Sequence, residues 1–580
     1  MAGLTSTLAN IWGNKKYRSL LLLSLILLGV MVDILLDIES VQFGRYEIHG
    51  KRLLLFSIGL LTALISMVTL FKSWKFFIEE ALPFGAILAP FAFWVTSRTV
   101  ELDFWYDELV TLTRFVFVPL QTTLTDYPYP NNHIFFNLLN NLYLKAAGLS
   151  QLTTLMEHPS FIRYLMLFYA IIGLVYLYLT GREFAGKLAG QFSLLVLATS
   201  IPFFNFATQV RGYGLSITLV CAMLFHWWRY EQKLAWRHLA AFTTAGALLI
   251  YTMPSTLYIL AGMMGWSGLV GLRQLFARRA QPLRPDTLLR TFAIPIAGLV
   301  AIGAAVLCYS PVLSSVLNNS VVSSRGMFKW VILTRLLPRV LTHFVSARWL
   351  LVALALAGLA LLFTRAIRQA QPGTAQRVGG LLFLLLAPFV MSYVRGDNPF
   401  DRIFLVQLPV FSLLIGIGLQ LLCRRLPQRL QRPGWVLFLL GVYTAVVFST
   451  QILRNEALVR QNNAAGIGSQ TIYANFYLVD YRPDQLMRDF FSQQDELAHE
   501  FYIYDLGDNA SAREYSAKYY GYYPSTVESL AGFHGAFYVF TAFPNQFLAE
   551  VQADYPHTTC QRLNSAVWYQ NIFLCDAGTP

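Results

Sequence analysis

The chain has 580 residues, of which 56% are hydrophobic and only 13% are charged, and its mean hydropathy is +0.50. This composition excludes a disordered chain, a DNA-binding arm and an ordinary soluble enzyme, because a soluble fold of this size cannot bury so much apolar surface. The formal net charge of +13 suggests nucleic acid in a soluble protein, but in a membrane protein it can record orientation alone. The composition therefore predicts a polytopic α-helical membrane protein. Whether its positive charge indicates a partner or only orientation depends on where the basic residues lie.

Thirteen segments are apolar over roughly the 20 residues that a helix needs to cross a bilayer. They lie at residues 19–38, 52–71, 81–97, 161–180, 188–206, 213–229, 238–254, 256–275, 291–309, 348–365, 378–394, 402–422 and 435–452. The first is not a cleavable signal peptide, since its apolar run is long and no small-residue cleavage site follows. We expect a two-span N-terminal segment (1–80), a transmembrane core (81–454) and a C-terminal domain (455–580).

The basic residues gather in alternate loops. With the N-terminus in the cytoplasm, the N-terminal segment and the short cytoplasmic loops hold 22 Lys and Arg against five acids, a charge of +17, and the rest of the chain carries −4. Cytoplasmic loops of membrane proteins are enriched in Lys and Arg. We therefore expect a membrane protein with a cytoplasmic N-terminus. Three long outer segments then lie at 98–160, 310–347 and 453–580, and nucleic acid is not predicted as a partner.

The outer tail changes to a polar and aromatic composition that favours a small α/β domain. Residues 500–505 and 536–541 are typical of strands, residues 509–520 and 544–554 are typical of helices, and residues 557–563 and 567–575 favour a hairpin. Cys560 and Cys575 would lie on the two arms of this hairpin. A disulfide is allowed outside the cytoplasm, so we predict one here, with two buried free thiols as the alternative.

The other three cysteines carry no metal-site spacing. Cys221, Cys308 and Cys423 lie in or beside apolar runs, which predicts that they are buried small hydrophobic residues.

Four acids lie among aromatic residues just after an apolar span, at Glu101, Asp103, Asp107 and Glu108. Acids so close to a membrane are costly unless they are solvated or used in function. On a helix, Asp103 and Asp107 would share one face at i and i+4, while Glu108 would point elsewhere. The alternative is a solvated acidic cap on a helix.

Three further segments place polar residues at the outer ends of spans. Asn131, Asn132 and His133 follow two prolines and precede an apolar run. Taken alone, this pattern favours an N-cap at Asn131 or Asn132 with a surface histidine. Arg211 precedes the span that begins near Tyr213, where it could snorkel to lipid headgroups or bind a phosphate. The last segment holds two arginines and two aspartates that could simply pair with one another: Arg395, Asp397, Asp401 and Arg402.

In this order, the four segments resemble the GT-C superfamily of integral membrane glycosyltransferases, in the branch with lipid A aminoarabinose transferase, protein O-mannosyltransferases and RgtA-like transferases. The Asp-Glu pair of the family's first outer loop resembles Asp107 and Glu108 after Trp105. The polar motif that enters a later span resembles residues 129–133. The resemblance covers about residues 80–420, and the thirteen spans with an outer α/β tail resemble the layout of the aminoarabinose transferase.

The family's later arginines also have counterparts in this chain. An arginine and a tyrosine at the start of a span resemble Arg211 and Tyr213, and an arginine before a proline in a late span resembles Arg402 before Pro409. The chain departs from its relatives at residues 251–254, which lack a histidine that relatives often carry. It also has Pro-Asn-Asn-His where some relatives have Glu-Lys-Pro or His-Pro-Pro. The resemblance therefore does not identify the donor sugar or the acceptor.

The resemblance implies a glycosyltransferase of the bacterial inner membrane. It would move a sugar from a polyprenyl phosphate to a lipid, glycan or protein acceptor on the outer, periplasmic face, with inversion. In this role Asp107 would be the general base, and Glu108 would orient a substrate or support the local fold. The donor's phosphate and sugar would be bound by the remaining polar residues: Arg211, Tyr213, Arg402, Arg395 in reserve, His133 and Asn132. No cofactor is required. Four of the side chains could gather a metal ion, but no spacing demands one: Asp103, Asp107, Glu108 and His133.

Three other functions remain as alternatives. A transporter or flippase of a lipid-linked sugar would need ionisable residues within its spans and internal repeats, and the acids inside an apolar run are Asp33 and Asp37, near its outer end. A structural membrane subunit would not need acids and arginines on one face. An O-antigen ligase or another enzyme that uses a polyprenyl diphosphate would also need outer arginines.

Overall fold

The structure is a computed structural model. It describes residues 40–43, 46–49, 77–100, 102, 104–128, 132–277, 285–318, 329–346, 348–369, 372–396, 401–427, 439–454, 457, 490–493, 497–504, 510–541, 544–563 and 571–578. The chain falls into two compact units, Met1–Ala86 with Pro433–Leu437 and Ile87–Arg432 with Phe438–Pro580. In the first unit, β1 (Ser40–Phe43) and β2 (Tyr46–His49) form an antiparallel pair with Ser40 opposite His49.

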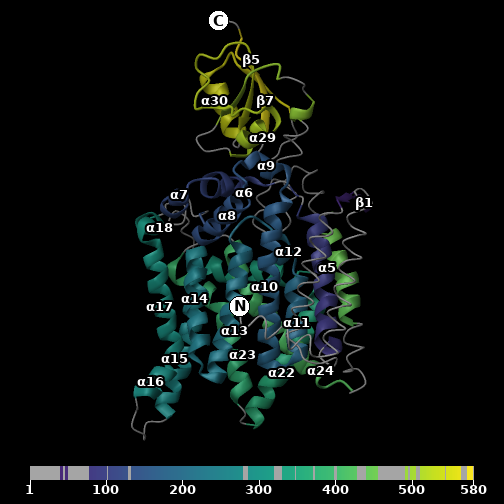
Figure 1. The fold of residues 1–580 in the computed structure, drawn as a ribbon, viewed down its shortest axis with the longest axis vertical. Helices are drawn as coiled ribbons and strands as arrows, with labels where there is room; N and C mark the ends of the chain where they lie inside the picture. Colours follow the sequence, from purple (N-terminus) through teal and green to yellow (C-terminus); the bar gives the residue numbers. More distant parts are fainter. Residues whose placement is uncertain are drawn as a thin grey trace, which may run out of the picture. The chain divides into compact units, whose positions relative to one another are not determined.

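Long helices form most of the second unit and follow one another as packed neighbours (Figure 1). Helix α10 packs on α11 and α13, α11 packs on α24, and α24 packs on α22. On the other side α13 packs on α14, α14 on α17, α17 on α15 and α15 on α23. The bounds of these helices are α10 Ser160–Ala185, α11 Lys187–Ala198, α13 Tyr213–Lys233, α14 Trp236–Thr252, α15 Leu257–Ala277, α17 Ala293–Tyr309, α22 Trp349–Gln369, α23 Pro372–Arg395 and α24 Leu408–Cys423.

Six helices of the described residues are long and apolar enough to cross a membrane, so the chain is a mostly helical, polytopic integral membrane protein. They are Glu79–Arg98, Ser160–Ala185, Pro254–Phe276, Ala293–Leu317, Ala375–Arg395 and Asp401–Cys423. A seventh is added if Lys329–Val345 and Trp349–Leu362, bent by 104°, form one span. The six coincide with spans predicted from the sequence. The total of thirteen stays a prediction. Two of the segments, 19–38 and 52–71, lie outside the described residues, and the helices at 213–229 and 238–254 are not among those long and apolar enough to cross a membrane.

The predicted span at 188–206 is broken in the structure. Helix α11 ends at Ala198, and a separate short helix, α12 (Ile201–Phe206), follows. Pro202 has no N–H to donate to the carbonyl of residue 198, and its ring would clash there, which favours a break at this point. The buried Arg348 donates to the carbonyl oxygen of Val196, one of the last carbonyls of α11, which have no partner within the helix.

Small residues allow several of these helices to approach closely. A Cβ atom at Gly358 in α22 would meet the carbonyl oxygen of Gly418 in α24, and a Cβ atom at Gly416 would meet Ser193 in α11. Such close approach is typical of helices packed in lipid, where no hydrophobic effect drives helices together. Between α10 and α11 the chain turns at Gly186, whose φ of +115° favours glycine.

The predicted outer segment 98–160 is largely helical and lies between the long helices and the tail (Figure 1). Its elements are α6 (Tyr106–Thr111), η2 (Leu112–Val116), α7 (Leu120–Thr125), α8 (Ile134–Ala146) and α9 (Leu152–Glu157). Helix α8 buries three asparagines, and Asn141 donates to the carbonyl oxygen of Val118 (2.8 Å), which ties α8 to the chain that precedes α7. Other short elements are α16 Pro285–Thr291, η3 Pro254–Thr256, η4 Ser310–Val312, α18 Leu313–Leu317, α20 Lys329–Val331, η5 Ile332–Leu336, α21 Leu337–Val345, η6 Asp401–Gln407 and η8 Tyr443–Phe448.

The tail contains a small mixed five-stranded sheet in the order β4-β3-β5-β7-β6. Strand β3 is parallel to β4 and β5, whereas β7 is antiparallel to β5 and β6. The predicted strands and helices are present, and β4 is an addition. The bounds are β3 Phe501–Tyr504, α29 Ala510–Tyr520, β4 Ser525–Val527, β5 Ala536–Thr541, α30 Pro544–Asp554, β6 Thr559–Arg562 and β7 Asn571–Asp576.

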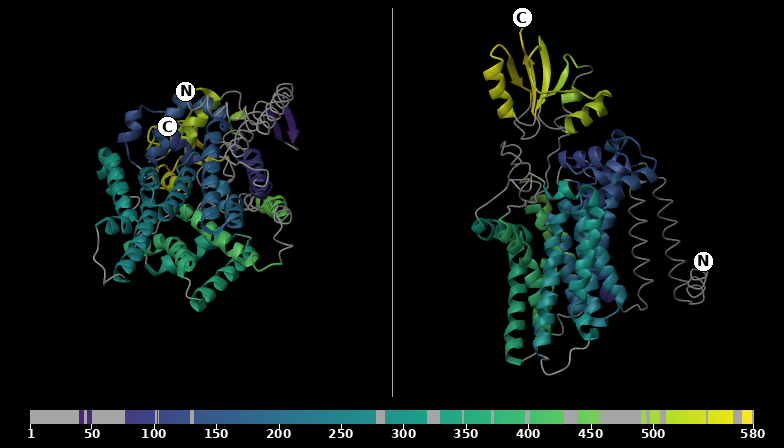
Figure 2. Two further views of the ribbon diagram at one scale, coloured as in Figure 1. Left: turned by 60° about the horizontal axis from the view of Figure 1, so that its bottom comes forward. Right: turned by 90° about the vertical axis from the view of Figure 1, so that its left-hand side faces the viewer.

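Alternate residues of β5 face opposite sides of this sheet, as expected for a strand. Phe537 and Val539 pack with Phe547 and Val551 of α30, while the intervening Tyr538 and Phe540 pack in a second core that includes residues of α29. Figure 2 shows the sheet with these two helices on either side. Both faces of the sheet are therefore covered.

The cysteines follow the predictions in part. Cys560 and Cys575 are bonded as a disulfide at paired positions of β6 and β7. Cys221 is buried as predicted, and Cys423 is partly buried. Cys308 is exposed, so the prediction that it is buried was wrong. Cys308 lies on α17 next to Leu307, which is also exposed, and an apolar residue on a spanning helix can face lipid instead of protein.

Candidate active site

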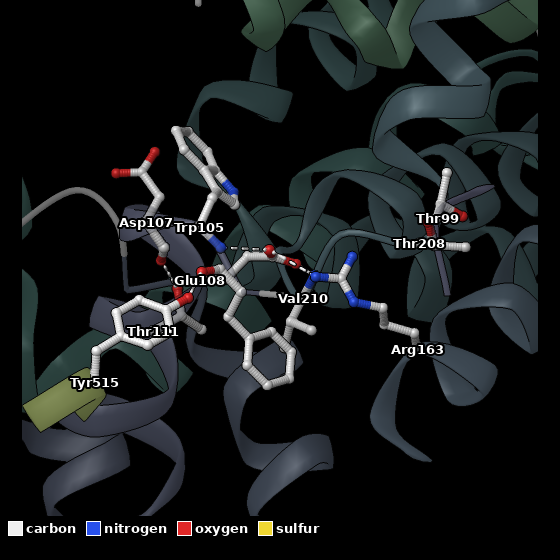
Figure 3. Close-up of polar contacts among 10 residues, drawn as sticks. Thr99, Trp105, Asp107, Glu108, Thr111, Arg163, Thr208, Val210 and Tyr515 are labelled. Atoms are coloured by element: carbon white, nitrogen blue, oxygen red, sulfur yellow. Dashed lines mark hydrogen bonds and ion pairs between the residues drawn. The ribbon is translucent and has the colours of Figure 1, made fainter. Parts of the chain in front are cut away.

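Both carboxylate oxygens of Glu108 accept hydrogen bonds. One carboxylate oxygen accepts hydrogen bonds from the backbone N–H of Trp105 (3.1 Å) and from Nη2 of Arg163 (3.0 Å). The other oxygen accepts from the backbone N–H of Val210 (2.7 Å). The side chain is buried. Glu108 thereby caps the start of α6 and joins it to α10 and to the segment before α13 (Figure 3).

Asp107 precedes Glu108, and its carboxylate points in a different direction (Figure 3). Its Oδ2 atom forms an ion pair with Nη1 of Arg211 and lies 3.6 Å from Nη2 of Arg402. All three residues are at least nine-tenths buried. Three segments far apart in the sequence, α6, the residues before α13 and η6, therefore bring one carboxylate and two guanidinium groups together.

Two aromatic rings hold the guanidinium group of Arg211. Its central carbon lies 5.2 Å from the centre of the Tyr213 ring and 5.8 Å from that of the Trp105 ring, which are cation–π distances. Tyr213 is the first residue of α13 and is buried. The ring of Tyr213, which the sequence predicts as a donor-binding residue, therefore lies against the guanidinium group of Arg211.

His133 is buried directly before α8, and its Nδ1 accepts a hydrogen bond from the backbone N–H of Gly212 (2.9 Å). Burial, together with the positive charges of Arg211 and Arg402, holds the pKa of His133 well below its usual value. The ring is therefore neutral near pH 7, with Nδ1 as acceptor and a proton on Nε2. A Cβ atom at position 212 would lie 2.8 Å from Nδ1, so glycine permits this approach.

The amide of Asn132 is used within the outer segment. It donates to the carbonyl oxygen of Asp126 (2.6 Å), and its oxygen accepts from the side chain of Asn137 (2.8 Å). These bonds hold the chain between α7 and α8. Arg395, at the end of α23, is exposed and donates to the hydroxyl of Tyr258 (2.9 Å).

Several alternatives from the sequence are resolved by these positions. Asp107 and Glu108 are buried, so they are not a solvated cap, and His133 is not on the surface. Asp401 pairs with Arg339, which comes from α21 and not from its own turn. Glu101, Asp103, Asn131 and Asp397 lie outside the described residues, and no group of three or more possible metal ligands occurs among those that are described.

Sequence reasoning missed Arg163 and the backbone of Val210. Arg163 is buried in the first turn of α10, a helix that is long and apolar enough to span a membrane. A charged residue at such a position is costly unless it is paired, and this signal could have found it. The contribution of Val210 is a backbone N–H, which leaves no mark in the sequence.

No protein-family model and no curated protein sequence matches the chain. Among solved structures, it is similar to ArnT from Cupriavidus metallidurans in the apo state, with 14% identity and a TM-score of 0.48 over 84% of this chain and 98% of that one. For the structure of this ArnT bound to undecaprenyl phosphate, the identity is 14% and the TM-score is 0.47, over 89% of this chain and 98% of that one.

A second similarity is to the archaeal oligosaccharyltransferase AglB from Archaeoglobus fulgidus, in complex with an inhibitory peptide and a dolichol-phosphate. Its identity is 13% and its TM-score 0.41, over 78% of this chain and 65% of that one. ArnT and AglB are both GT-C membrane glycosyltransferases. Because these TM-scores are below 0.5 and the identities below 25%, what this chain can catalyse must follow from its own residues.

Proposed function

We propose that this protein is a glycosyltransferase that takes a sugar from a polyprenyl-phosphate donor and transfers it to a hydroxyl group of a lipid, glycan or protein on the outer face of the bacterial inner membrane. The observation that carries the proposal is the buried cluster in which the Asp107 carboxylate meets Arg211 and Arg402. A base beside two fixed positive charges, at the outer end of a helix bundle, suits this chemistry.

The two arginines would bind the phosphate of the donor. A guanidinium group presents a planar fork of donors that matches two phosphate oxygens, and it keeps its charge when buried. As the bond between the anomeric carbon and the phosphate oxygen breaks, its electron pair moves onto the phosphate. Fixed positive charge at that point stabilises the transition state.

Asp107 would act as the general base. The acceptor hydroxyl oxygen bonds to the anomeric carbon while its proton passes to a carboxylate oxygen of Asp107. The leaving phosphate lies on the opposite face of the sugar, so the reaction inverts the anomeric carbon. No metal enters this scheme, because the arginines supply the positive charge.

The neighbouring residues take supporting roles. Glu108 holds α6 in place through its three hydrogen bonds, and Asn132 holds the chain that leads to His133. Neutral His133 can donate a hydrogen bond from Nε2 to a sugar or phosphate oxygen. Tyr213 keeps the Arg211 guanidinium in place. Arg395 is the alternative arginine for binding the phosphate. An apolar groove between helices would receive the prenyl chain, the lipid class bound to ArnT and AglB.

The test is a product analysis with the purified full chain in lipid vesicles that contain polyprenyl-phosphate sugars and candidate acceptors. We expect release of polyprenyl monophosphate together with an acceptor that carries the sugar in inverted configuration. Movement of the intact lipid-linked sugar to the other leaflet, without release of polyprenyl phosphate, would identify a flippase and overturn the proposal. Release of a diphosphate would point to a ligase-type donor.

A further inference from the structure

Helix α29 of the tail packs directly against α6, the helix that carries Asp107, and against α9. Residues of α29 and of the tail strands share one buried core with residues of α6, η2, α8 and α9. This core includes Ala512 and Tyr515 of α29, with Tyr519 packed at its edge. The spacing i, i+3, i+7 places these three side chains on one face of the helix, so this face of α29 lies in the core that the tail shares with the outer segment.

Tyr515 makes the most specific contact across this core. Its side chain is fully buried, and its hydroxyl donates a hydrogen bond to the carbonyl oxygen of Phe104 (3.1 Å). Phe104 lies one residue before Trp105, the N-cap of α6, and three residues before Asp107. Figure 3 shows the Tyr515 ring beside the first turns of α6.

Two separate contacts therefore fix the start of α6. Glu108 ties it to the membrane core through Arg163 and Val210, and Tyr515 ties it to the tail. A buried carbonyl without its donor costs free energy, so the segment before Asp107 is held most stably when the tail is docked. A base must be held within a fraction of an ångström of its working position, because small displacements lower the rate steeply.

We infer that Tyr515 is a positioning residue for the reaction, and that through it the C-terminal domain completes the active site by fixing the turn that carries Asp107. This role rests on the proposed function, in which Asp107 is the base. The tail then acts on the rate of transfer through α6, independently of any contact with an acceptor.

The same helix supplies a matched control. Tyr520 also lies on α29, and its hydroxyl also donates to a backbone carbonyl, but that carbonyl belongs to Phe491 of the tail (2.9 Å). Tyr515→Phe and Tyr520→Phe each remove one hydroxyl from the same helix and keep the ring. They differ in whether the lost hydrogen bond leads to the Asp107 segment.

The experiment compares both variants with the wild type as full-length protein, in two measurements. The first is the transfer rate per donor-binding site, with the sites counted by titration with polyprenyl phosphate. Counting sites corrects for any molecules that fail to fold. We expect Tyr515→Phe to lower the rate per site about 10-fold with little change in KM for donor or acceptor, and Tyr520→Phe to stay within about 2-fold of the wild type.

The second measurement is hydrogen exchange of the backbone amides of residues 104–112, which needs no enzymatic activity. We expect faster exchange there in Tyr515→Phe and unchanged exchange in Tyr520→Phe. If both the exchange and the rate per site of Tyr515→Phe match those of Tyr520→Phe, the inference is overturned. If the exchange differs but the wild type releases no polyprenyl phosphate, the positioning of α6 stands and the proposed function fails.

Discussion

The outer segment and the tail bury their carboxylates in different ways. In the outer segment, Asp107 and Glu108 are both paired with buried arginines. In the tail, Glu514 of α29 is 6% exposed, and it accepts a hydrogen bond from the hydroxyl of Tyr523 (3.4 Å). Burial raises the pKa of Glu514 to about 7, although the Tyr523 hydroxyl and the charge of Arg513 act against this rise.

The difference shows what each region is built to do. Removing a charge from water is offset only where a full opposite charge and well-placed donors meet it. The outer segment places a guanidinium group against each of its two paired acids, Asp107 and Glu108, where the chemistry is proposed. In the tail, burial lets Glu514 take up a proton near neutral pH.

The largest expected effect comes from the base itself. Asp107→Asn should lower turnover about 10²–10⁴-fold, the range for loss of a general base, because an amide cannot accept the acceptor's proton. The transfer assay should be normalised to donor-binding sites, since Arg211 and Arg402 lose a charged partner and the variant will melt earlier. Near-normal turnover per site would remove Asp107 from the mechanism.

Glu108→Gln should act mainly on stability. It removes the carboxylate charge that pairs with the buried Arg163, which costs about 3–5 kcal/mol, and the melting temperature of the detergent-solubilised protein should fall accordingly. Glu183→Gln is the control, because its ion pair with Arg229 is partly exposed and should contribute less than about 1 kcal/mol. Equal melting temperatures for the two variants would contradict the structural role of Glu108.

Arg211→Ala should weaken binding of the donor phosphate about 10–100-fold, the value of charged hydrogen bonds to a phosphate. Binding of polyprenyl phosphate measured by calorimetry gives this directly. Arg395→Ala should have a smaller effect, since this arginine is exposed and bound to Tyr258. A change in acceptor affinity alone in Arg211→Ala would show that the arginine does not bind the phosphate.

The smallest effect is a pH dependence of the tail. The folded state raises the pKa of Glu514 from 4.5 to about 7, so between these values the folded state holds a proton that the unfolded state releases. Its contribution to stability is complete below pH 4.5 and is lost as the pH rises through 7, with a slope of at most about 1.4 kcal/mol per pH unit.

Glu514→Gln should remove this dependence. Melting temperatures of the wild type and the variant should be measured between pH 4.5 and 8. As the pH rises, the wild type should lose stability relative to the variant, by no more than this slope. A difference that does not change with pH would mean that folding does not raise the pKa of Glu514.

Local patterns predicted much of the fold. The long apolar helices and the tail strands at 501–504 and 536–541 follow from hydrophobic periodicity, which is a property of neighbouring residues. The break at Pro202 was missed because the apolar run continues through it, although proline is itself a local signal. Strand β4 was missed because three residues of an edge strand carry almost no pattern.

The sequence by itself determined the class of protein, the apolar helices and the residue types of the site, because composition, hydropathy and short motifs are carried by adjacent residues. Only the tertiary structure decided which residues meet. The pairing of Asp107 with Arg211 and Arg402, the three bonds of Glu108 and the contact of Tyr515 with Phe104 join segments up to 411 positions apart. Such contacts depend on how the helices pack and on backbone groups that every residue has, so no local pattern encodes them.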